Sequence, residues 1–573
     1  KQKTAYEITY GDWSSDVCSS DLGASSAGAV NFSAAGTLSG TFALAADSTI
    51  QVADSTTGTI SGVMSGVSMA LTKTGSGTLS LSGTNTYSGA TTISAGTLAV
   101  SGSGSLGSGT YSAAITNNSA FVYSSSANQT LQTGVISGTG TLTKDTSSTS
   151  TLTLSGTNTY TGATTVSAGT LKFSNASGLG GSSSGQGTTV AAGATLEVAA
   201  AVTSAEPLTI SGTGASSAGA LNFSAGGTLS GTVALAADST VQVANSTTGT
   251  VSGVISGSYA LTKGGTGTGT LSLSNANTYT GTTTISTGTL KISNDSALGE
   301  SGGTRSTTSV TAGATLEVAG GGSLSSAEPL TINGTSATNG ALYFSASGTL
   351  SGTITMGSAS SVSAASGKTA TLSGVVSGNY ALTKADSGTL ALAADNTFAG
   401  TLTISAGTLS VTGTGSLGAG SPNNFTSNIV NSAAFVYSSS DDQTLSGVIS
   451  GTGGTVTKDT DSTSTLTLSG TNTYTGTTSI SKGTVKITAA DALGRSGASY
   501  STTTVSTSAT LEVAGVVTSA ESLTVSGTGA SSLGGAIRSR GGSGDAFTTR
   551  GSSSASRVRT CPGWGGGTVS RVS

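Results

Sequence analysis

The chain has 573 residues, of which only 8% are charged and 4% are aromatic, with 88 Gly, four Pro, two Cys and no His. This composition argues against a Pro-rich linker and charge-driven disorder, and the lack of His excludes Ser–His–Asp and Cys–His catalysis. Residues 23–536 carry 12 Lys+Arg and 19 Asp+Glu, a net charge of −7, which suits a nucleic-acid backbone poorly. We therefore predict no catalytic residues, no bound metal, no cofactor and no nucleic-acid partner.

The two ends of the chain differ from the body between them. The stretch YGDWSSDVCSSDL, from Tyr10 to Leu22, resembles translated sequencing-adapter read-through. The tail breaks off the pattern in the middle of a repeat, as a frameshift would, and holds six of the eight Arg. We predict that residues 1–22 are a non-native or unstructured leader and that residues 537–573 are an atypical, disordered tail. The alternative for the tail is a genuine basic segment that binds nucleic acid or an acidic surface.

One string recurs five times between these ends. It covers residues 77–100, 151–173, 269–292, 388–411 and 465–487, and its second copy reads TLTLSGTNTYTGATTVSAGTLKF. A lysine precedes the aromatic residue of each copy by 14 or 16 positions. Shorter phrases such as ATLEV and AEPLTI recur as well. Self-similarity on this scale predicts one repetitive body over residues 23–536 without a sharp internal boundary.

The periodicity within the repeats is that of short strands. In TLTL, from Thr151 to Leu154, Thr alternates with Leu, so one face is apolar and the other polar. Gly169 interrupts the following strands and permits a turn. Strands this short bury a face only when each coil stacks on the next and pairs its backbone groups there. The sequence therefore predicts an all-β parallel solenoid with roughly 20–25 residues per coil and little or no helix.

The repeated positions carry little reactive chemistry, and we interpret them as structural. The aromatic would cap a corner or stack on a nearby coil, with ligand stacking as the alternative, and Phe398 in one copy favours the structural role. Asn158 and its counterparts are interpreted as turn residues or a buried amide ladder. The predicted structural aromatics are Tyr87, Tyr160, Tyr279, Phe398 and Tyr474, and the predicted turn glycines are Gly89, Gly162, Gly281, Gly400 and Gly476.

These strings resemble the autotransporter-associated β-strand repeat, also called the passenger-associated transport repeat. Phrases such as EPLTISGTG and GATLEVAG resemble the rest of such passenger domains. The resemblance implies a right-handed, single-stranded, pectin-lyase-like parallel β-helix, exported by a Gram-negative bacterium through type V secretion. It implies a non-enzymatic stalk or adhesin that is secreted or displayed on the cell surface or outer membrane. Its repeats would support translocation and folding.

The same resemblance names the expected partners. They are the protein's own C-terminal translocator barrel, the outer-membrane assembly machinery, and glycans or surfaces of a host or of the environment. The chain shows no stretch with the alternating pattern of a translocator barrel, so we expect a passenger fragment.

Two other functions stay open at this point. A carbohydrate-active β-helix enzyme could use carboxylates alone, and Asp441 with Asp442 form its best candidate pair. Asp459 and Asp461, two positions apart on one strand, could bind calcium weakly. A non-membrane Thr-rich solenoid of the matrix or ice-binding type would need one flat face of Thr rows in register, which the uneven spacing of the repeats disfavours.

Overall fold

The computed structural model describes most of the chain between residues 28 and 514. The described residues are 28–145, 149–181, 187–300, 307–320, 324–335, 339–418, 423–459, 463–495, 502–514, 517, 522–527, 529, 536–539, 547–550 and 569–572. The predicted leader, 1–22, lies outside them. Within the predicted tail, the described residues form β58 (Ile537–Ser539), β59 (Phe547–Arg550) and β60 (Val569–Val572). Disorder of the rest of that tail stays a prediction.

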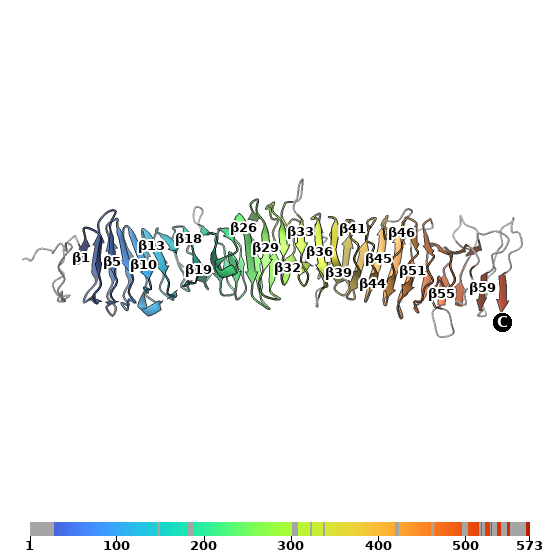
Figure 1. The fold of residues 1–573 in the computed structure, drawn as a ribbon, viewed down its shortest axis with the longest axis horizontal. Helices are drawn as coiled ribbons and strands as arrows, with labels where there is room; N and C mark the ends of the chain where they lie inside the picture. The colour runs from blue at the N-terminus through green and yellow to red at the C-terminus, as the bar shows by residue number, and fades with distance from the viewer. Residues whose placement is uncertain are drawn as a thin grey trace, which may run out of the picture. The chain divides into compact units, whose positions relative to one another are not determined.

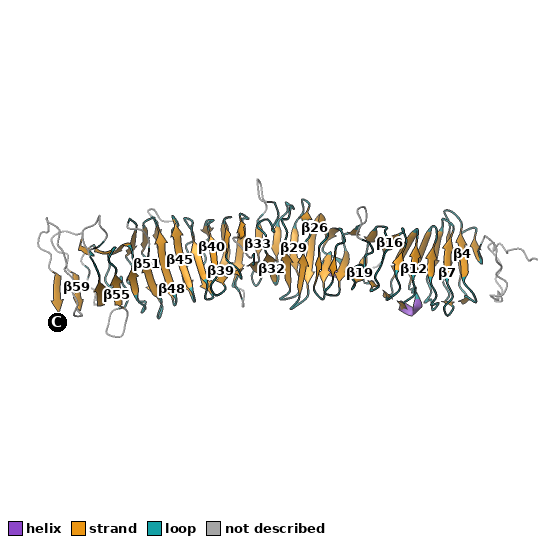
Figure 2. Cartoon of the chain, turned by 180° about the vertical axis from the view of Figure 1, so that it is seen from behind, coloured by secondary structure: helices purple, strands orange, loops and turns teal. Residues whose placement is uncertain are grey.

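The described chain is a parallel β-solenoid of about 21 turns with 1% helix. This confirms the predicted all-β solenoid; its handedness and its likeness to pectin lyase stay predictions. Short strands joined by loops make up nearly all of it (Figure 2), and the named helical turns are η2 (Gly107–Gly109) and η3 (Ala215–Ser217). The chain divides into two compact units, Lys1–Gly288 and Thr289–Ser573.

In the first unit the strands form long parallel ladders, which Figure 1 shows side by side from β1 onward. The first ladder is β1 (Val30–Phe32), β4 (Ser48–Val52), β7 (Leu71–Thr74), β9 (Thr91–Ile93), β12 (Ile115–Asn117) and β15 (Ile136–Ser137). The second is β2 (Gly36–Leu38), β5 (Thr57–Ile60), β8 (Thr78–Leu81), β10 (Thr97–Gly102), β13 (Ala120–Ser125), β16 (Thr141–Lys144), β18 (Thr164–Val166), β20 (Thr188–Val190), β23 (Leu208–Gly212), the start of β26 (Val233–Val243) and β28 (Ile255–Ser256).

Other strands of this unit pair on the remaining side of each coil. They are β3 (Phe42–Ala43) with β6 (Met64–Ser65), and β11 (Thr110–Tyr111), β14 (Gln129–Leu131), β17 (Thr151–Leu154), β19 (Gly169–Phe173), β21 (Ala194–Val198), β24 (Leu221–Phe223), the end of β26, β29 (Leu261–Gly264) and β31 (Thr283–Ile285). A further run is β22 (Thr203–Ser204), β25 (Gly227–Leu229), β27 (Thr248–Val251) and β30 (Thr270–Leu273). The strands β20, β21 and β22 pair with β23, β24 and β25, so one coil contributes three strands here.

The second unit repeats this arrangement. One sheet is β35 (Leu324–Ser326), β38 (Gly348–Leu350), β40 (Thr369–Leu372), β43 (Thr389–Leu392), β45 (Thr408–Gly413), β48 (Ala434–Ser439), β51 (Thr455–Lys458), β53 (Thr478–Ile480), β55 (Thr502–Val505) and β57 (Ser522–Val525). Another ladder is β32 (Thr289–Ile292), β34 (Thr315–Val318), β37 (Leu342–Phe344), the end of β39 (Ile354–Ala364), β42 (Leu382–Ala385), β44 (Leu402–Ile404), β47 (Ile429–Asn431) and β50 (Ile449–Ser450).

Two shorter runs complete the second unit. They are β33 (Thr308–Val310), β36 (Leu330–Gly334), the start of β39 and β41 (Val376–Ser377), and then β46 (Asn424–Phe425), β49 (Gln443–Leu445), β52 (Thr465–Leu468), β54 (Gly483–Ile487), β56 (Ala509–Val513) and β58. In both units the core holds the inward Leu, Val and Ile of the strands. In segments such as TLTL the alternating Thr lie on the outer side, as the period of two predicts, whereas other strand threonines, such as Thr164 and Thr188, are buried.

Candidate functional site at the repeated corner

Each copy of the repeat spans about one coil and pairs with itself. The repeat begins on one strand, turns a corner, crosses a second strand and ends on a third strand that lies on the first. Thr78 pairs with Thr97, Thr151 with Thr170, Thr389 with Thr408 and Thr465 with Thr484, each 19 residues later. The repeated string therefore fixes the register of one coil on the next.

The corner itself is an extended segment with alternating burial. In the second copy Asn158, Tyr160 and the following core residues point inward, while Thr157 and Thr159 are exposed. The aromatic is at most 1% exposed in all five copies: Tyr87, Tyr160, Tyr279, Phe398 and Tyr474. No ring is therefore accessible for stacking on an external ligand.

The aromatic forms a pair with the residue four positions later. The hydroxyls of Tyr160 and Thr164 share a hydrogen bond of 2.7 Å, and the matching distances in the other tyrosine copies are 2.9, 2.6 and 2.6 Å. In the fourth copy the pair is Phe398 and Leu402, and both side chains are fully buried. Where the phenol is lost, its hydroxyl partner is lost with it, so no buried hydroxyl of this pair is left unmatched.

The match extends to the next coil. In the first copy Thr91 also shares a 2.7 Å hydrogen bond with Tyr111, whose ring packs edge-on against Tyr87 at 5.7 Å between centroids. In the fourth copy Phe425 occupies the place of Tyr111 and packs edge-on against Phe398 at 5.5 Å. The polar cluster Tyr87–Thr91–Tyr111 and the apolar cluster Phe398–Leu402–Phe425 therefore fill equivalent positions in the core with the same edge-on packing of two rings.

The asparagine of the corner connects three coils. Asn158 Oδ1 accepts from the N–H of Ile136 in the preceding coil at 2.9 Å, and its Nδ2 donates to the carbonyl oxygen of Gly178 in the following coil at 2.7 Å. The five equivalent side chains are at most 3% exposed: Asn85, Asn158, Asn277, Asn396 and Asn472. Each accepts from the preceding coil in the same way. The side chains bridge backbone groups rather than stacking on one another as a ladder.

The corner glycines lie against the preceding coil. A methyl group on Gly89 would lie 2.1 Å from the carbonyl oxygen of Met69, and one on Gly400 would lie 2.0 Å from that of Tyr380. The corresponding distances at Gly162, Gly281 and Gly476 are 2.1, 2.0 and 1.9 Å. None of the five has a positive φ. Glycine is required here because another backbone approaches closely, not because the chain turns through the left-handed region.

A buried lysine precedes each of the five corners. Lys73 donates to the carbonyl oxygens of Thr74, Gly75 and Ala95 at 2.8, 2.7 and 3.1 Å, and the Lys144 ammonium lies 5.9 Å from the ring centre of Tyr123. Five lysines are at most 1% exposed: Lys73, Lys144, Lys263, Lys384 and Lys458. Burial lowers the pKa of the first four to about 8. The spacing of these lysines is visible in the sequence, but their burial is not predicted by it, because lysine is rarely buried.

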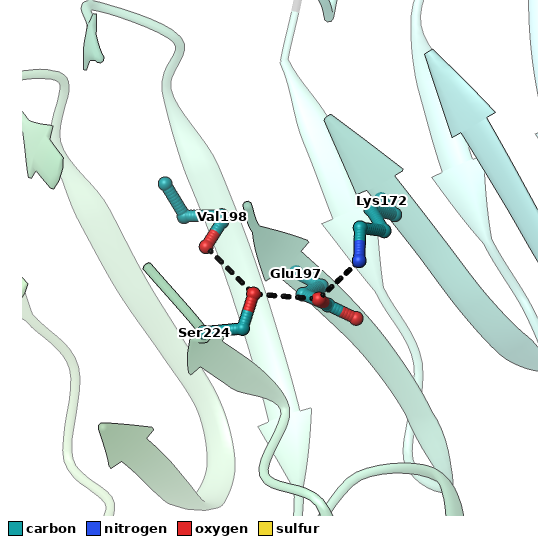
Figure 3. Close-up of polar contacts among 4 residues, drawn as sticks. All are labelled: Lys172, Glu197, Val198 and Ser224. Carbon is teal, nitrogen blue, oxygen red and sulfur yellow. Dashed lines mark hydrogen bonds and ion pairs between the residues drawn. The ribbon is translucent and has the colours of Figure 1, made fainter. Parts of the chain in front are cut away.

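The corner is followed by one of two coil types. After the second copy Lys172 on β19 faces Glu197 on β21 in register, with 2.9 Å between Nζ and Oε1, and Ser224 donates to the same carboxylate (Figure 3). The equivalent pairs are Lys291–Glu317 at 3.1 Å and Lys486–Glu512 at 3.8 Å. After the first and fourth copies the facing residues are Ala99 with Val122 and Ser410 with Val436.

Successive copies of the corner lie on different faces of the coil. In the first unit the corner backbone donates to Met64 of β6, Ile136 of β15 and Ile255 of β28 in turn. These three strands belong to three different ladders. In the second unit the acceptors are Val376 of β41 and Ile449 of β50, again on two ladders. Within each unit, therefore, the repeated corners do not form one continuous surface.

The aspartates predicted as candidates for catalysis or calcium binding lie outside the repeated corner. Asp442 accepts from the N–H of Thr465 in the next coil at 2.7 Å, and Asn128 accepts from Thr151 in the same way at 2.8 Å. Asp442 therefore occupies a position that an uncharged amide fills in the sister coil. Asp459 is exposed, and Asp461 lies outside the described residues. In the described part of the chain no three His, Cys, Asp or Glu side chains gather as a metal site would require.

Comparison with known proteins identifies the repeat. A family model described as the passenger-associated-transport-repeat matches residues 71–100, 147–173, 261–292, 382–411 and 461–487. Each match ends at the residue where the predicted copy ends, and three of the five begin at the lead-in with the buried lysine. No curated protein and no solved structure matches the chain. No described helix has the length and apolar character to cross a bilayer.

Proposed function

We propose that this chain is the passenger, or part of the passenger, of a Gram-negative autotransporter, displayed on the cell surface or secreted as a β-solenoid stalk or adhesin. The observation that carries the proposal is the fivefold match to the passenger-associated transport repeat on stacked coils. The repeat's Asn, aromatic and Lys side chains are buried, and its Gly lies directly against the preceding coil. Such a repeat suits a chain that adds one coil at a time as it emerges from a membrane.

The proposed partners are a translocator barrel and the outer-membrane assembly machinery, with glycans or surfaces as candidate ligands. To test the proposal, residues 23–536 are joined to an unrelated autotransporter's translocator and expressed in a Gram-negative host. We expect the chain to become accessible to antibody and protease on intact cells. Retention in the periplasm, while the host translocator's own passenger is displayed, would contradict the proposal.

We also propose that the solenoid has no catalytic activity. The support is that Asp442 performs the same backbone contact as Asn128. Incubation of the purified chain with plant and microbial polysaccharides should release no sugars. Release that disappears in the Asp442→Asn variant, but not in an Asp395→Asn control, would favour the enzyme instead.

A further inference from the structure

A buried carboxyl group outside the repeated corner has no role in the proposed function. Glu206 lies in the bend between β22 and β23 and is 4% exposed. Its Oε1 accepts a 3.0 Å hydrogen bond from the Thr188 hydroxyl, while Oε2 is buried and has no hydrogen-bond partner among the described residues. Burial of an ionised carboxylate without a compensating charge is unfavourable, whereas burial of the neutral carboxyl group costs much less.

The groups around this carboxyl are almost all neutral. Inside the coil it faces Thr188 on β20 and, beyond that strand, the corner of the second repeat, where Tyr160 is bonded to Thr164. Burial chiefly raises the pKa of Tyr160, and the charge of Glu206 raises it further. The other acids on adjoining strands point away: Glu197 pairs with Lys172, and Asp238 is exposed.

We propose that Glu206 makes the coil from Thr188 to Gly212 a pH-sensitive segment of the solenoid, closed most tightly when its carboxyl is protonated and loosened when it ionises. Burial raises the pKa of Glu206 from about 4.5 to about 7, a shift that the Thr188 hydrogen bond partly offsets. Ionisation is thus disfavoured in the closed coil but not in an opened one, where water reaches the carboxylate. A surface protein built in this way is tightest in acidic surroundings.

The second unit contains a glutamate in a similar place. Glu328 is 6% exposed and accepts a 3.0 Å hydrogen bond from the Thr308 hydroxyl, in the same AEPL phrase as Glu206. The two coils that carry this acid both follow a corner with the Lys–Glu pair on the outer face. The coil of the other type, residues 110–137, contains no acidic or basic residue and serves as an internal reference.

The test is hydrogen–deuterium exchange of the whole chain, read by mass spectrometry and corrected for the intrinsic pH dependence of exchange. The raised pKa means that protection is complete below about pH 4.5 and is lost as the pH rises to about 7. The opening constant of residues 188–212 should therefore rise by up to about tenfold per pH unit within that window and then level off. Residues 110–137 should show no such change.

Two variants show whether the Glu206 carboxyl, rather than another titrating group, causes the pH dependence of exchange. Glu206→Gln, which mimics the neutral acid, should flatten the profile of residues 188–212, and the control Glu197→Gln should leave it unchanged. If Glu206→Gln does not fold, Thr188→Val, which removes the Thr188 hydrogen bond to the carboxyl, should extend the window to higher pH. A flat profile in the natural chain, or an unchanged profile in Glu206→Gln or Thr188→Val, would overturn the proposal.

Discussion

At the scale of single residues, the polar side chains of the repeat act on neighbouring coils. The corner asparagine satisfies one donor of the coil before it and one acceptor of the coil after it. A buried backbone group without a partner costs more than an ordinary hydrogen bond contributes. This explains why asparagine occurs in all five corners although the neighbouring aromatic changes once.

Replacing Asn158 by Ala should therefore loosen this part of the solenoid strongly. The Ile136 N–H and the Gly178 carbonyl would lose their partner, and the local free energy of unfolding should fall by about 2–5 kcal/mol. Hydrogen exchange of residues 136–181 measures the change. The matched control is Thr159→Ala, an exposed neighbour, which should change it by less than about 0.5 kcal/mol. Equal effects of the two changes would contradict the bridging role.

The two aromatic clusters predict strong coupling between three residues. Thr91→Leu alone removes the hydroxyl that Tyr87 and Tyr111 share, while Tyr111 keeps its bond to the Gly89 carbonyl, and should cost about 2–4 kcal/mol. The triple variant Tyr87→Phe, Thr91→Leu, Tyr111→Phe reproduces the fourth copy's cluster and should recover most of that loss. Thermal unfolding of the single, double and triple variants gives the coupling free energies by a mutant cycle. Simple additivity of the single effects would refute the coupling.

At the scale of one element, the corner glycine allows one coil to touch the next. Gly89→Ala would press a methyl group against the carbonyl of Met69, so we expect a loss of about 3 kcal/mol or more. Gly40 has open space around it and no positive φ, so Gly40→Ala should change stability by less than about 0.5 kcal/mol. Limited proteolysis near residues 66–90 compares the two. Similar cleavage rates would contradict the close-approach explanation.

The Lys–Glu ion pair on the outer face recurs regularly between coils but contributes little to stability. Lys172 is 36% exposed, and exposed pairs contribute at most about 1 kcal/mol because water and salt screen them. The pair marks a coil type rather than supplying most of its stability. Tight contacts between coils come instead from the buried side chains of the interior.

At the scale of the whole molecule, the buried lysines should make stability depend on pH. Burial lowers the pKa of four of them to about 8, whereas in an unfolded chain their pKa is near 10.5. The unfolded state therefore binds more protons between these values, and stability should rise as the pH increases from about 8 to about 10. Above that the tyrosines reverse the trend, because burial raises their pKa to about 12 at Tyr111 and Tyr437.

Denaturant unfolding at pH 7.5, 9 and 10 tests this dependence. A variant with Met at Lys73, Lys144, Lys263 and Lys384 should lose the rise, because Met fills the same space without a titrating group. A control with Met at the exposed Lys368 should keep it. A rise that persists in the fourfold variant would show that other groups cause it.

Much of this architecture could be predicted from sequence because the repeat itself carries the strand period and the glycine positions. The alternation in TLTL gave the inward and outward faces, and Phe398 pointed to a structural role. Other features depend on which coil lies next to which. The bridging role of Asn158, the burial of Lys73 and the isolation of Glu206 follow from contacts about 20 residues away, which no local pattern encodes. The face of the coil on which each copy of the corner lies likewise depends on the lengths of the coils between the copies.

Surface display of variants in which residues 157–162 are changed one at a time to Ala would show whether coil stacking supports export. If the repeat supports export through coil stacking, display should alternate along the segment. It should fall for the inward Asn158, Tyr160 and the glycine at 162, and stay constant for the outward Thr157, Thr159 and Thr161. Loss of display on changing the outward threonines, with the inward residues tolerant, would contradict the account.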